Sequence, residues 1–265
     1  MNYIDAIILG LVQGLTEFIP VSSSGHLVIF NHLLGLEGEF IFDVLLNFGT
    51  LSALILYYRK RIWSLLSRSF LGKEWSLLAK LLAATIPAFF IGTLFASQIK
   101  MLNQYIWVVV IMLVVLAVPM ILYGKERVGA DNAPLEKSVS WRTATKVGLM
   151  QAIALIPGTS RSGITILTGL QSKLSAVRAA EFSFMLAIPT IAGASFKVLL
   201  MDGGFQYIAN NPGIVIVGNL VSFASGLFAV GFLLRLLSTR GLKDFGWYRI
   251  GLASFLSILL ITGII

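Results

Sequence analysis

Polar and ionisable side chains are concentrated in one short stretch, residues 13–26, with the sequence QGLTEFIPVSSSGH. This stretch supplies an amide, a carboxylate, three consecutive serine hydroxyls and an imidazole, from Gln13, Glu17, Ser22, Ser23, Ser24 and His26. In a very apolar protein such groups are costly at membrane depth, and they therefore indicate a functional site. Backbone N–H groups at a helix start beside small residues bind anions, so the chemistry favoured here begins with an anionic ligand.

The proline at position 20 predicts a break between two short helices. Gln13 and Glu17 are four residues apart and share one face of the first helix. Ser22 is a natural N-cap for the second helix, which places Ser23 and His26 together one turn in. A serine and a histidine spaced i, i+3 suit a nucleophile and its general base. Water activated by His26 or by a metal ion is the alternative nucleophile, and the spacing leaves this choice open.

A second polar stretch, PGTSRSGIT at residues 157–165, carries Arg161 between small hydroxyl residues. Placing an arginine at membrane depth costs about 2.5–3.5 kcal/mol on insertion scales, and an anionic ligand offsets that cost. Its planar guanidinium suits phosphate oxygens bidentately. We therefore expect one chamber lined by Glu17, His26 and Arg161, with two helix N-termini directed into it.

Each of these residues also has a purely structural interpretation. Glu17 and Arg161 could form an ion pair that serves only the fold, and Gln13 could make a hydrogen bond between helices. His26 could be a core histidine with satisfied partners. The hydroxyl residues could equally be caps or packing residues, namely Ser22, Ser24, Ser162 and Thr165.

The composition indicates an integral membrane protein. Of the 265 residues, 57% are apolar and only 12% are charged, and the mean hydropathy is +0.89. That charged fraction is about half of the fraction usual in soluble domains. The chain has no cysteine, which excludes disulfides and thiolate metal sites. No cleavable signal peptide is predicted, because the N-terminus lacks a basic region.

Hydrophobic runs predict ten helical pieces, arranged as two repeats joined by a polar linker. The first repeat, residues 1–123, is a re-entrant hairpin followed by three spans, at 2–18, 22–35, 41–58, 77–97 and 105–123. The linker is residues 124–144. The second repeat, residues 145–265, has the same order, at 145–156, 160–171, 176–198, 213–236 and 247–264. The hairpin helices are each too short to cross roughly 30 Å of hydrocarbon.

Matching motifs support the repeat. GLMQ at 148–151 matches GLVQ at 10–13, and SRSG at 160–163 matches SSSG at 22–25, both at an offset of 138. Three spans per repeat is an odd number, so the two halves must face opposite ways. The predicted fold class is an all-α polytopic membrane protein with two inverted-topology repeats, each a re-entrant helix hairpin plus three transmembrane helices.

Basic residues predict the orientation. They gather on the segments 59–80, 124–146 and 235–249, whereas the opposite loops, 97–104 and 198–212, hold only Lys100. The positive-inside rule places the basic side in the cytoplasm. Both termini and the opening of the first hairpin then face outward. The net charge of +8 is interpreted as this topology signal and not as affinity for nucleic acid.

The two motifs together resemble the undecaprenyl-diphosphate phosphatase family, the bacitracin-resistance proteins of bacterial membranes. The resemblance covers the full length of the chain. It implies an enzyme of the bacterial cell (inner) membrane that acts at the outer face. The reaction would remove the terminal phosphate from a polyprenyl diphosphate carrier and return the monophosphate to peptidoglycan synthesis. A divalent cation is implied, with Mg²⁺ favoured and Ca²⁺ as an alternative.

The resemblance also implies roles for particular residues. The catalytic residues would be Glu17, Ser23, His26 and Arg161. The substrate would be held by Gln13, Ser22, Ser24, Ser160, Ser162 and Thr165. The metal would be held by Glu17 with Gln13, although many relatives have Glu where this chain has Gln13, which leaves Glu17 as the only carboxylate of the motif. A homodimer is one option for the assembly.

A secondary transporter or lipid flippase is the competing class, because inverted repeats and a midplane arginine occur in carriers. The Ser-x-x-His pair opposite Arg161 favours hydrolysis instead. Phosphate release by the purified protein in detergent separates the two classes, since detergent leaves no compartments to transport between.

Overall fold

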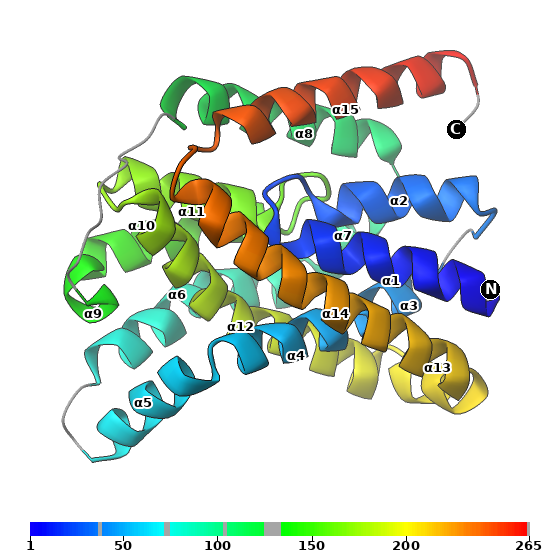
Figure 1. Ribbon diagram of the computed structural model, residues 1–265. Helices are drawn as coiled ribbons and strands as arrows, with labels where there is room; N and C mark the ends of the chain where they lie inside the picture. The colour runs from blue at the N-terminus through cyan, green and yellow to red at the C-terminus, as the bar shows by residue number, and fades with distance from the viewer. Residues whose placement is uncertain (37–38, 72–74, 103–104, 125–133, 264–265) are drawn as a thin grey trace.

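The computed structural model describes residues 1–36, 39–71, 75–102, 105–124 and 134–263, and over these ranges it contains helices and no β-strand (Figure 1). The helices of the first half are α1 Tyr3–Phe18, α2 Ser23–Leu33, α3 Phe40–Leu45, α4 Asn47–Tyr57, α5 Arg59–Phe70, α6 Ser76–Leu94, α7 Ala96–Leu102 and α8 Ile106–Tyr123. Those of the second half are α9 Leu135–Ser138, α10 Trp141–Ile153, α11 Arg161–Gln171, α12 Ala176–Met201, α13 Gly204–Asn210, α14 Pro212–Leu237 and α15 Lys243–Ile261.

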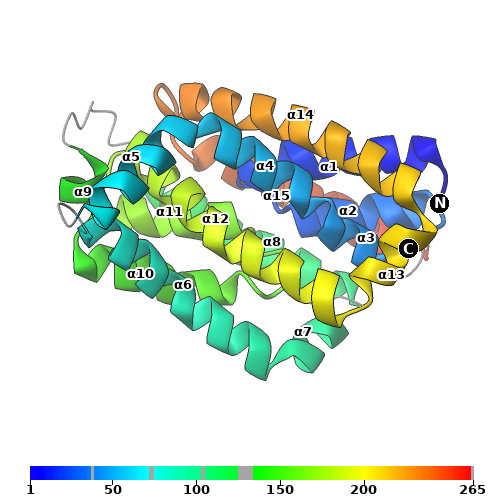
Figure 2. The same ribbon diagram turned by 90° about the horizontal axis from the view of Figure 1, so that it is seen from below.

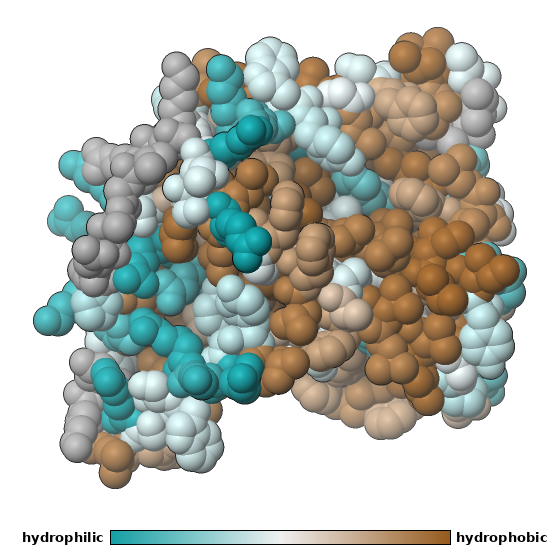
Figure 3. All heavy atoms as spheres, in the orientation of Figure 1, coloured by the Kyte–Doolittle hydropathy of each residue, from teal (hydrophilic) through white to brown (hydrophobic). Residues whose placement is uncertain are grey.

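Six of these helical segments are long and apolar enough to cross a membrane. They are Phe40–Tyr57 (α3 and α4 together), Ser76–Leu94, Ile106–Tyr123, Ala176–Met201, Pro212–Leu237 and Lys243–Ile261. Each coincides with a predicted span to within a few residues. Large apolar side chains are exposed along them, as on the brown surface of Figure 3, where lipid would cover them. The chain is therefore a multi-pass helical membrane protein.

Several helices lie in segments where the sequence predicted none. The charge pattern predicted only a basic segment after the first span, but Arg59–Phe70 forms the amphipathic helix α5. Its side chains Trp63 and Phe70 are 75% and 82% exposed, as expected for a helix at a membrane boundary. In the predicted linker 124–144, residues 125–133 lie outside the described ranges. The rest of that linker is partly helical, because α9 lies there and α10 already begins at Trp141 after the N-cap Ser140.

Both broken-helix hairpins are present, and a turn of the same backbone conformation precedes the second helix of each. Ser22, the N-cap of α2, has φ 76° and ψ 95°, and Ser160, the N-cap of α11, has φ 72° and ψ 107°. Each serine hydroxyl accepts a hydrogen bond of 3.2 Å from the N–H of a glycine three residues on, Gly25 and Gly163 respectively. A non-glycine residue at positive φ is strained, and here the capping bond compensates for that strain. The N-cap predicted at Ser22 is confirmed.

The first helix of each hairpin packs against a long helix from the other half of the chain. α1 lies along α14, and α10 lies along α6 (Figures 1 and 2). Glycine permits both approaches, since a Cβ at Gly10 would lie 2.5 Å from the carbonyl oxygen of Gly218 and one at Gly148 would lie 2.6 Å from that of Ala84. Small residues at such contacts allow close helix packing in membranes. The two hairpin tips are therefore held in the interior of the helix bundle.

The two ends of the bundle differ in character. Both termini and α13 lie at one end, and α5 and α9 lie at the other (Figures 1 and 2). Hydrophilic residues are concentrated at the α5–α9 end of the face shown in Figure 3, where α5 alone carries Arg59, Lys60, Arg61 and Arg68. This asymmetry is the arrangement expected of a protein that follows the positive-inside rule.

Candidate active site

A cavity of about 810 Å³ lies between the hairpins and the spanning helices. At one end its lining includes Gln13, Glu17, Ser23 and Arg161. From there it extends to the residues beside the start of α3, which lies towards the end of the bundle that carries the termini. Asn31, Leu36, Glu39, Phe40 and Asp43 line this outer part. The most polar residues of both motifs thus meet an interior space large enough for a small ligand.

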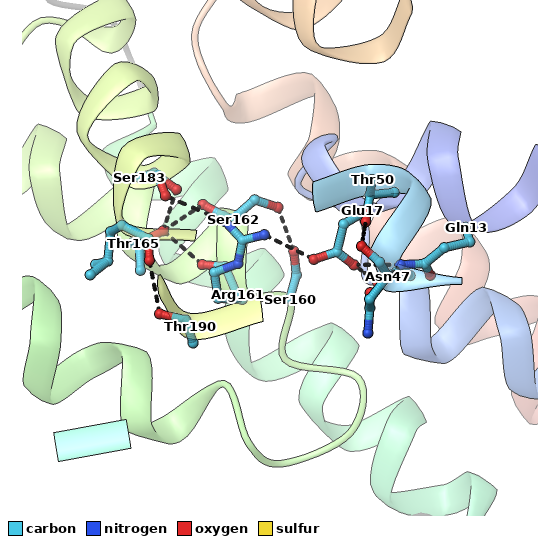
Figure 4. Close-up of polar contacts among 12 residues, drawn as sticks. Gln13, Glu17, Asn47, Thr50, Ser160, Arg161, Ser162, Thr165, Ser183 and Thr190 are labelled. Carbon is cyan, nitrogen blue, oxygen red and sulfur yellow. Dashed lines mark hydrogen bonds and ion pairs between the residues drawn. The ribbon is translucent and has the colours of Figure 1, made fainter. Parts of the chain in front are cut away.

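Glu17, at the end of α1, is the centre of the polar contacts. Its Oε1 accepts from Arg161 Nη2 at 2.8 Å, and its Oε2 accepts from Ser23 Oγ at 2.6 Å. Gln13 Nε2 donates to the same Oε2 at 3.2 Å and to Asn47 Oδ1 at 2.7 Å. Figure 4 shows Arg161 and Gln13 on opposite sides of Glu17. The structure therefore brings Glu17, Ser23, Gln13 and Arg161 together from both hairpins.

Arg161 begins α11, and its position is supported by α12. Its Nη1 donates a long hydrogen bond of 3.4 Å to the carbonyl oxygen of Ser183. Thr165 Oγ1 donates to the carbonyl oxygen of Arg161 at 2.7 Å and lies 2.6 Å from Ser183 Oγ (Figure 4). The Arg161 side chain is 12% exposed. Because only one of its N–H groups bonds to Glu17, the guanidinium keeps donors for an anion in the cavity.

The remaining hydroxyl residues of the motifs join the two hairpin tips. Ser24 Oγ lies 3.2 Å from Ser22 Oγ and accepts from the N–H of Gly158 in the other hairpin at 3.4 Å. In the matching position, Ser162 Oγ lies 3.2 Å from Ser160 Oγ and donates to the carbonyl oxygen of Ile19 at 3.4 Å. Of these four serines, only Ser24 is among the residues lining the cavity. The contacts of the other three are structural, and their predicted contact with substrate stays a prediction.

Ser23 and His26 are hydrogen-bonded to other residues, so the role predicted for His26 as the base that activates Ser23 stays a prediction. His26 Nδ1 lies 2.7 Å from the carbonyl oxygen of Ser22, and Nε2 lies 2.8 Å from the Tyr248 hydroxyl. A carbonyl can only accept, so Nδ1 carries a proton, and in the neutral ring Nε2 accepts from Tyr248. The ring also stacks on Tyr248 at a centroid distance of 5.8 Å. His26 is buried and is not among the residues that line the cavity, and both of its ring nitrogens have partners other than Ser23.

Gln13 and Glu17 do not offer the donor set of a divalent cation. Such ions take oxygen ligands directed at one point, whereas Gln13 presents its amide nitrogen to Glu17 and Asn47. The Glu17 carboxylate is already paired with Arg161. Among the described residues no group of three or more His, Cys, Asp or Glu side chains could hold a metal, so a bound cation would also take ligands from waters or substrate oxygens. The predicted need for a cation therefore stays a prediction.

Two adjacent residues of α15 contact the two hairpins, and the motif spacing did not predict them. Tyr248 bonds to His26 of the first hairpin. Arg249 is fully buried, and its Nη2 donates to the carbonyl oxygen of Gly158 in the second hairpin at 2.9 Å. Arg249 also donates to main-chain carbonyls of α8, at Leu113 and Met112. The signal that could have found it is a charged residue within an apolar span, which is costly unless it has partners.

Together, the fold and the site define a polytopic membrane protein with two broken-helix hairpins, whose tips place a carboxylate, a guanidinium and a serine hydroxyl at an interior cavity. Residues 6–255 match the family model described as "Bacitracin resistance protein BacA". The chain belongs to this family, which confirms the resemblance stated from the two motifs.

Curated relatives that share one name align with nearly the whole length of this chain. A protein named "Undecaprenyl-diphosphatase" from Porphyromonas gingivalis is 36% identical, with 100% of this chain and 99% of the relative covered. Proteins of the same name from Flavobacterium psychrophilum and Bdellovibrio bacteriovorus are 38% and 36% identical. The alignment with the Flavobacterium protein covers 94% of this chain and 93% of the relative, and the alignment with the Bdellovibrio protein covers 99% of this chain and 98% of the relative.

Proposed function

We propose that this protein is an integral-membrane phosphatase that hydrolyses undecaprenyl diphosphate to undecaprenyl phosphate and inorganic phosphate, and so recycles the lipid carrier for cell-wall synthesis. The observation that carries the proposal is the contact of Ser23, Glu17 and Arg161 at the cavity. Family membership and the printed name of the full-length relatives support the same activity. A transporter or flippase is less favoured, because a carrier needs no serine hydroxyl bonded to a carboxylate.

The geometry supports Ser23 as the nucleophile and Glu17 as its general base. The 2.6 Å hydrogen bond runs from Ser23 Oγ to Glu17 Oε2, so the carboxylate is placed to take the hydroxyl proton as Oγ attacks the terminal phosphorus. The bridging oxygen leaves with the lipid monophosphate. Water then hydrolyses the phosphoserine and releases inorganic phosphate. Glu17 replaces His26 in the role that the motif spacing had suggested for the histidine.

Arg161 supplies electrostatic stabilisation in this scheme. Phosphoryl transfer spreads negative charge over the equatorial oxygens, and positioned cationic donors stabilise that charge. Arg161 lies beside the same carboxylate that bonds to Ser23. An attacking water activated directly by Glu17 is the alternative, in which Ser23 serves only to position the carboxylate.

We further propose the inverted repeat and the orientation. The matched strained N-caps at Ser22 and Ser160, and the exchange of partners between α1–α14 and α10–α6, support two halves related by an approximate two-fold axis in the membrane plane. The basic α5 end is assigned to the cytoplasm. The termini and the outer part of the cavity then face the outside of the cell membrane. The homodimer stays a prediction. We attribute the positive net charge to the membrane topology and not to binding of nucleic acid.

The test is phosphate release from undecaprenyl diphosphate by the purified protein in detergent. Steady release of inorganic phosphate, with undecaprenyl phosphate as the lipid product, is the expected result. A correctly folded preparation that binds the lipid without releasing phosphate would favour the transporter class instead.

A further inference from the structure

Two buried oxygen atoms in the outer part of the cavity have no hydrogen-bond partner. Asn31 Nδ2 donates to Asp43 Oδ2 at 2.7 Å. The other oxygen of each side chain, Asn31 Oδ1 and Asp43 Oδ1, is buried without a hydrogen-bond partner, although both residues line the cavity. Leaving a buried acceptor unpaired costs about 1–3 kcal/mol, and more for a charged group. Two unpaired oxygens, on side chains that are hydrogen-bonded to each other, therefore point to a ligand that accepts electron pairs.

The surroundings of this pair are acidic. Glu39 lines the same part of the cavity, and its Oε2 accepts from the Tyr207 hydroxyl at 2.7 Å. Burial, the hydrogen bond to Glu39 and the charges of Glu39 and Asp43 raise the pKa of Tyr207. Neither carboxylate forms a salt bridge with a described lysine or arginine.

In the second half of the chain, the residue that corresponds to Asp43 is paired with a positive charge. At the offset of 138, the counterpart of Asp43 is Glu181. Glu181 Oε2 forms a salt bridge of 2.6 Å with Arg178 Nη1. The counterpart of Arg178 at this offset is Phe40, so the cation that pairs with the acid in one half is missing from the other. Asp43 therefore has no positive partner on its own helix.

The substrate of the proposed reaction makes this need greater. Among the described residues that line the cavity, Arg161 is the only lysine or arginine, and it is paired with Glu17. A lipid diphosphate in the same space adds further negative charge beside Glu39 and Asp43. Like charges repel more strongly near a protein than in bulk water, so a cation bound in this part of the cavity would help to hold the diphosphate.

We propose that Asn31 Oδ1 and Asp43 Oδ1 bind a divalent cation, which neutralises the phosphate nearer the lipid while Arg161 faces the terminal phosphate. Mg²⁺ typically takes one or two carboxylates and completes its shell with waters and substrate phosphate oxygens, so two protein oxygens suffice. Asp43 in α3 precedes Asn47, the first residue of α4, by four residues, and Asn47 bonds to Gln13 beside Glu17. The cation site itself stands on the unpaired oxygens, and only the phosphate partner rests on the proposed function.

The experiment is titration of the purified protein in detergent with Mn²⁺, without lipid, following the EPR signal of the free ion. We expect Asp43→Asn to weaken Mn²⁺ binding by more than tenfold and Asn31→Ala to weaken it by several fold. Glu17→Gln should bind Mn²⁺ as the parent does. Asp202→Asn, which changes an exposed carboxylate at the same end of the bundle, is the matched control and should also bind as the parent does.

Two results would overturn the site: Mn²⁺ binding by Asp43→Asn equal to that of the parent, or loss of Mn²⁺ binding in Glu17→Gln alone. If Asp43→Asn elutes as an aggregate, Asn31→Ala decides by the same criterion. Because no substrate is present, the outcome is independent of phosphate release, and a failed phosphatase assay would refute the proposed function without touching this site. In an active enzyme, Asp43→Asn should also raise the Mg²⁺ concentration that gives half-maximal rate by more than tenfold.

Discussion

Replacing Ser23 with alanine tests whether the Ser23 hydroxyl is the nucleophile. The change removes the Oγ that donates to Glu17 at 2.6 Å, while Glu17 keeps its bonds to Arg161 and Gln13. If Ser23 only positions the carboxylate, the loss is one hydrogen bond to a charged group, about 1.5–3 kcal/mol. That energy corresponds to a fall in rate of about 10- to 150-fold. If Ser23 is the nucleophile, the covalent route is lost, and we expect a fall of more than about 1,000-fold.

The assay is phosphate release from undecaprenyl diphosphate in detergent, with binding of the lipid measured on the same preparation. Ser24→Ala is the matched control, because its hydroxyl contacts Ser22 and Gly158 rather than Glu17, and it should lose about tenfold or less. Unchanged lipid binding with no turnover in Ser23→Ala supports the serine nucleophile. Turnover of Ser23→Ala within about 150-fold of the parent refutes it and leaves water activated by Glu17 as the attacking group.

The other predictions concern His26, Arg161, Arg249 and the orientation. His26→Ala should lose activity without changing the shape of the pH–rate profile, because the ring contacts Tyr248 and not Ser23; residual activity that climbs with pH would restore the histidine as the base. Arg161→Lys keeps the charge and loses the planar fork, so kcat/KM should fall by well over tenfold, and near-normal turnover would make the arginine structural. Arg249→Lys cannot reproduce the bonds to three carbonyls, so its thermal unfolding midpoint in detergent should fall, and an unchanged midpoint would contradict that anchoring role. The chain lacks cysteine, so single cysteines can report the orientation. A cysteine replacing Gln206 should react with an impermeant reagent added outside intact cells, and one replacing Lys137 should not; the reverse labelling would invert the topology. The position near Asn103 would serve as well, but it lies outside the described residues.

Local features of this protein were predictable from the sequence. The six spans follow from apolar runs of sufficient length. The two hairpin breaks follow from proline and from serine as an N-cap, and Ser22 and Ser160 cap their helices through glycines three residues on. Each of these features depends on interactions within a few residues, so the sequence pattern carries the information directly. The amphipathic helix α5 was not predicted, because its four basic residues interrupt the apolar run that marks a span.

The pairing of groups at the site was decided only by the tertiary structure. Spacing places Ser23 and His26 one turn into the same helix, but it does not say what lies on each side of that helix. Ser23 meets Glu17, which precedes it by six residues across the hairpin break, and His26 meets Tyr248, more than two hundred residues away. The unpaired oxygens of Asn31 and Asp43 were likewise hidden in the sequence. A side chain's partner is set by how helices from distant parts of the chain pack against one another. Helical periodicity shows on which face of its own helix a residue lies, but not which residue of another helix packs against that face.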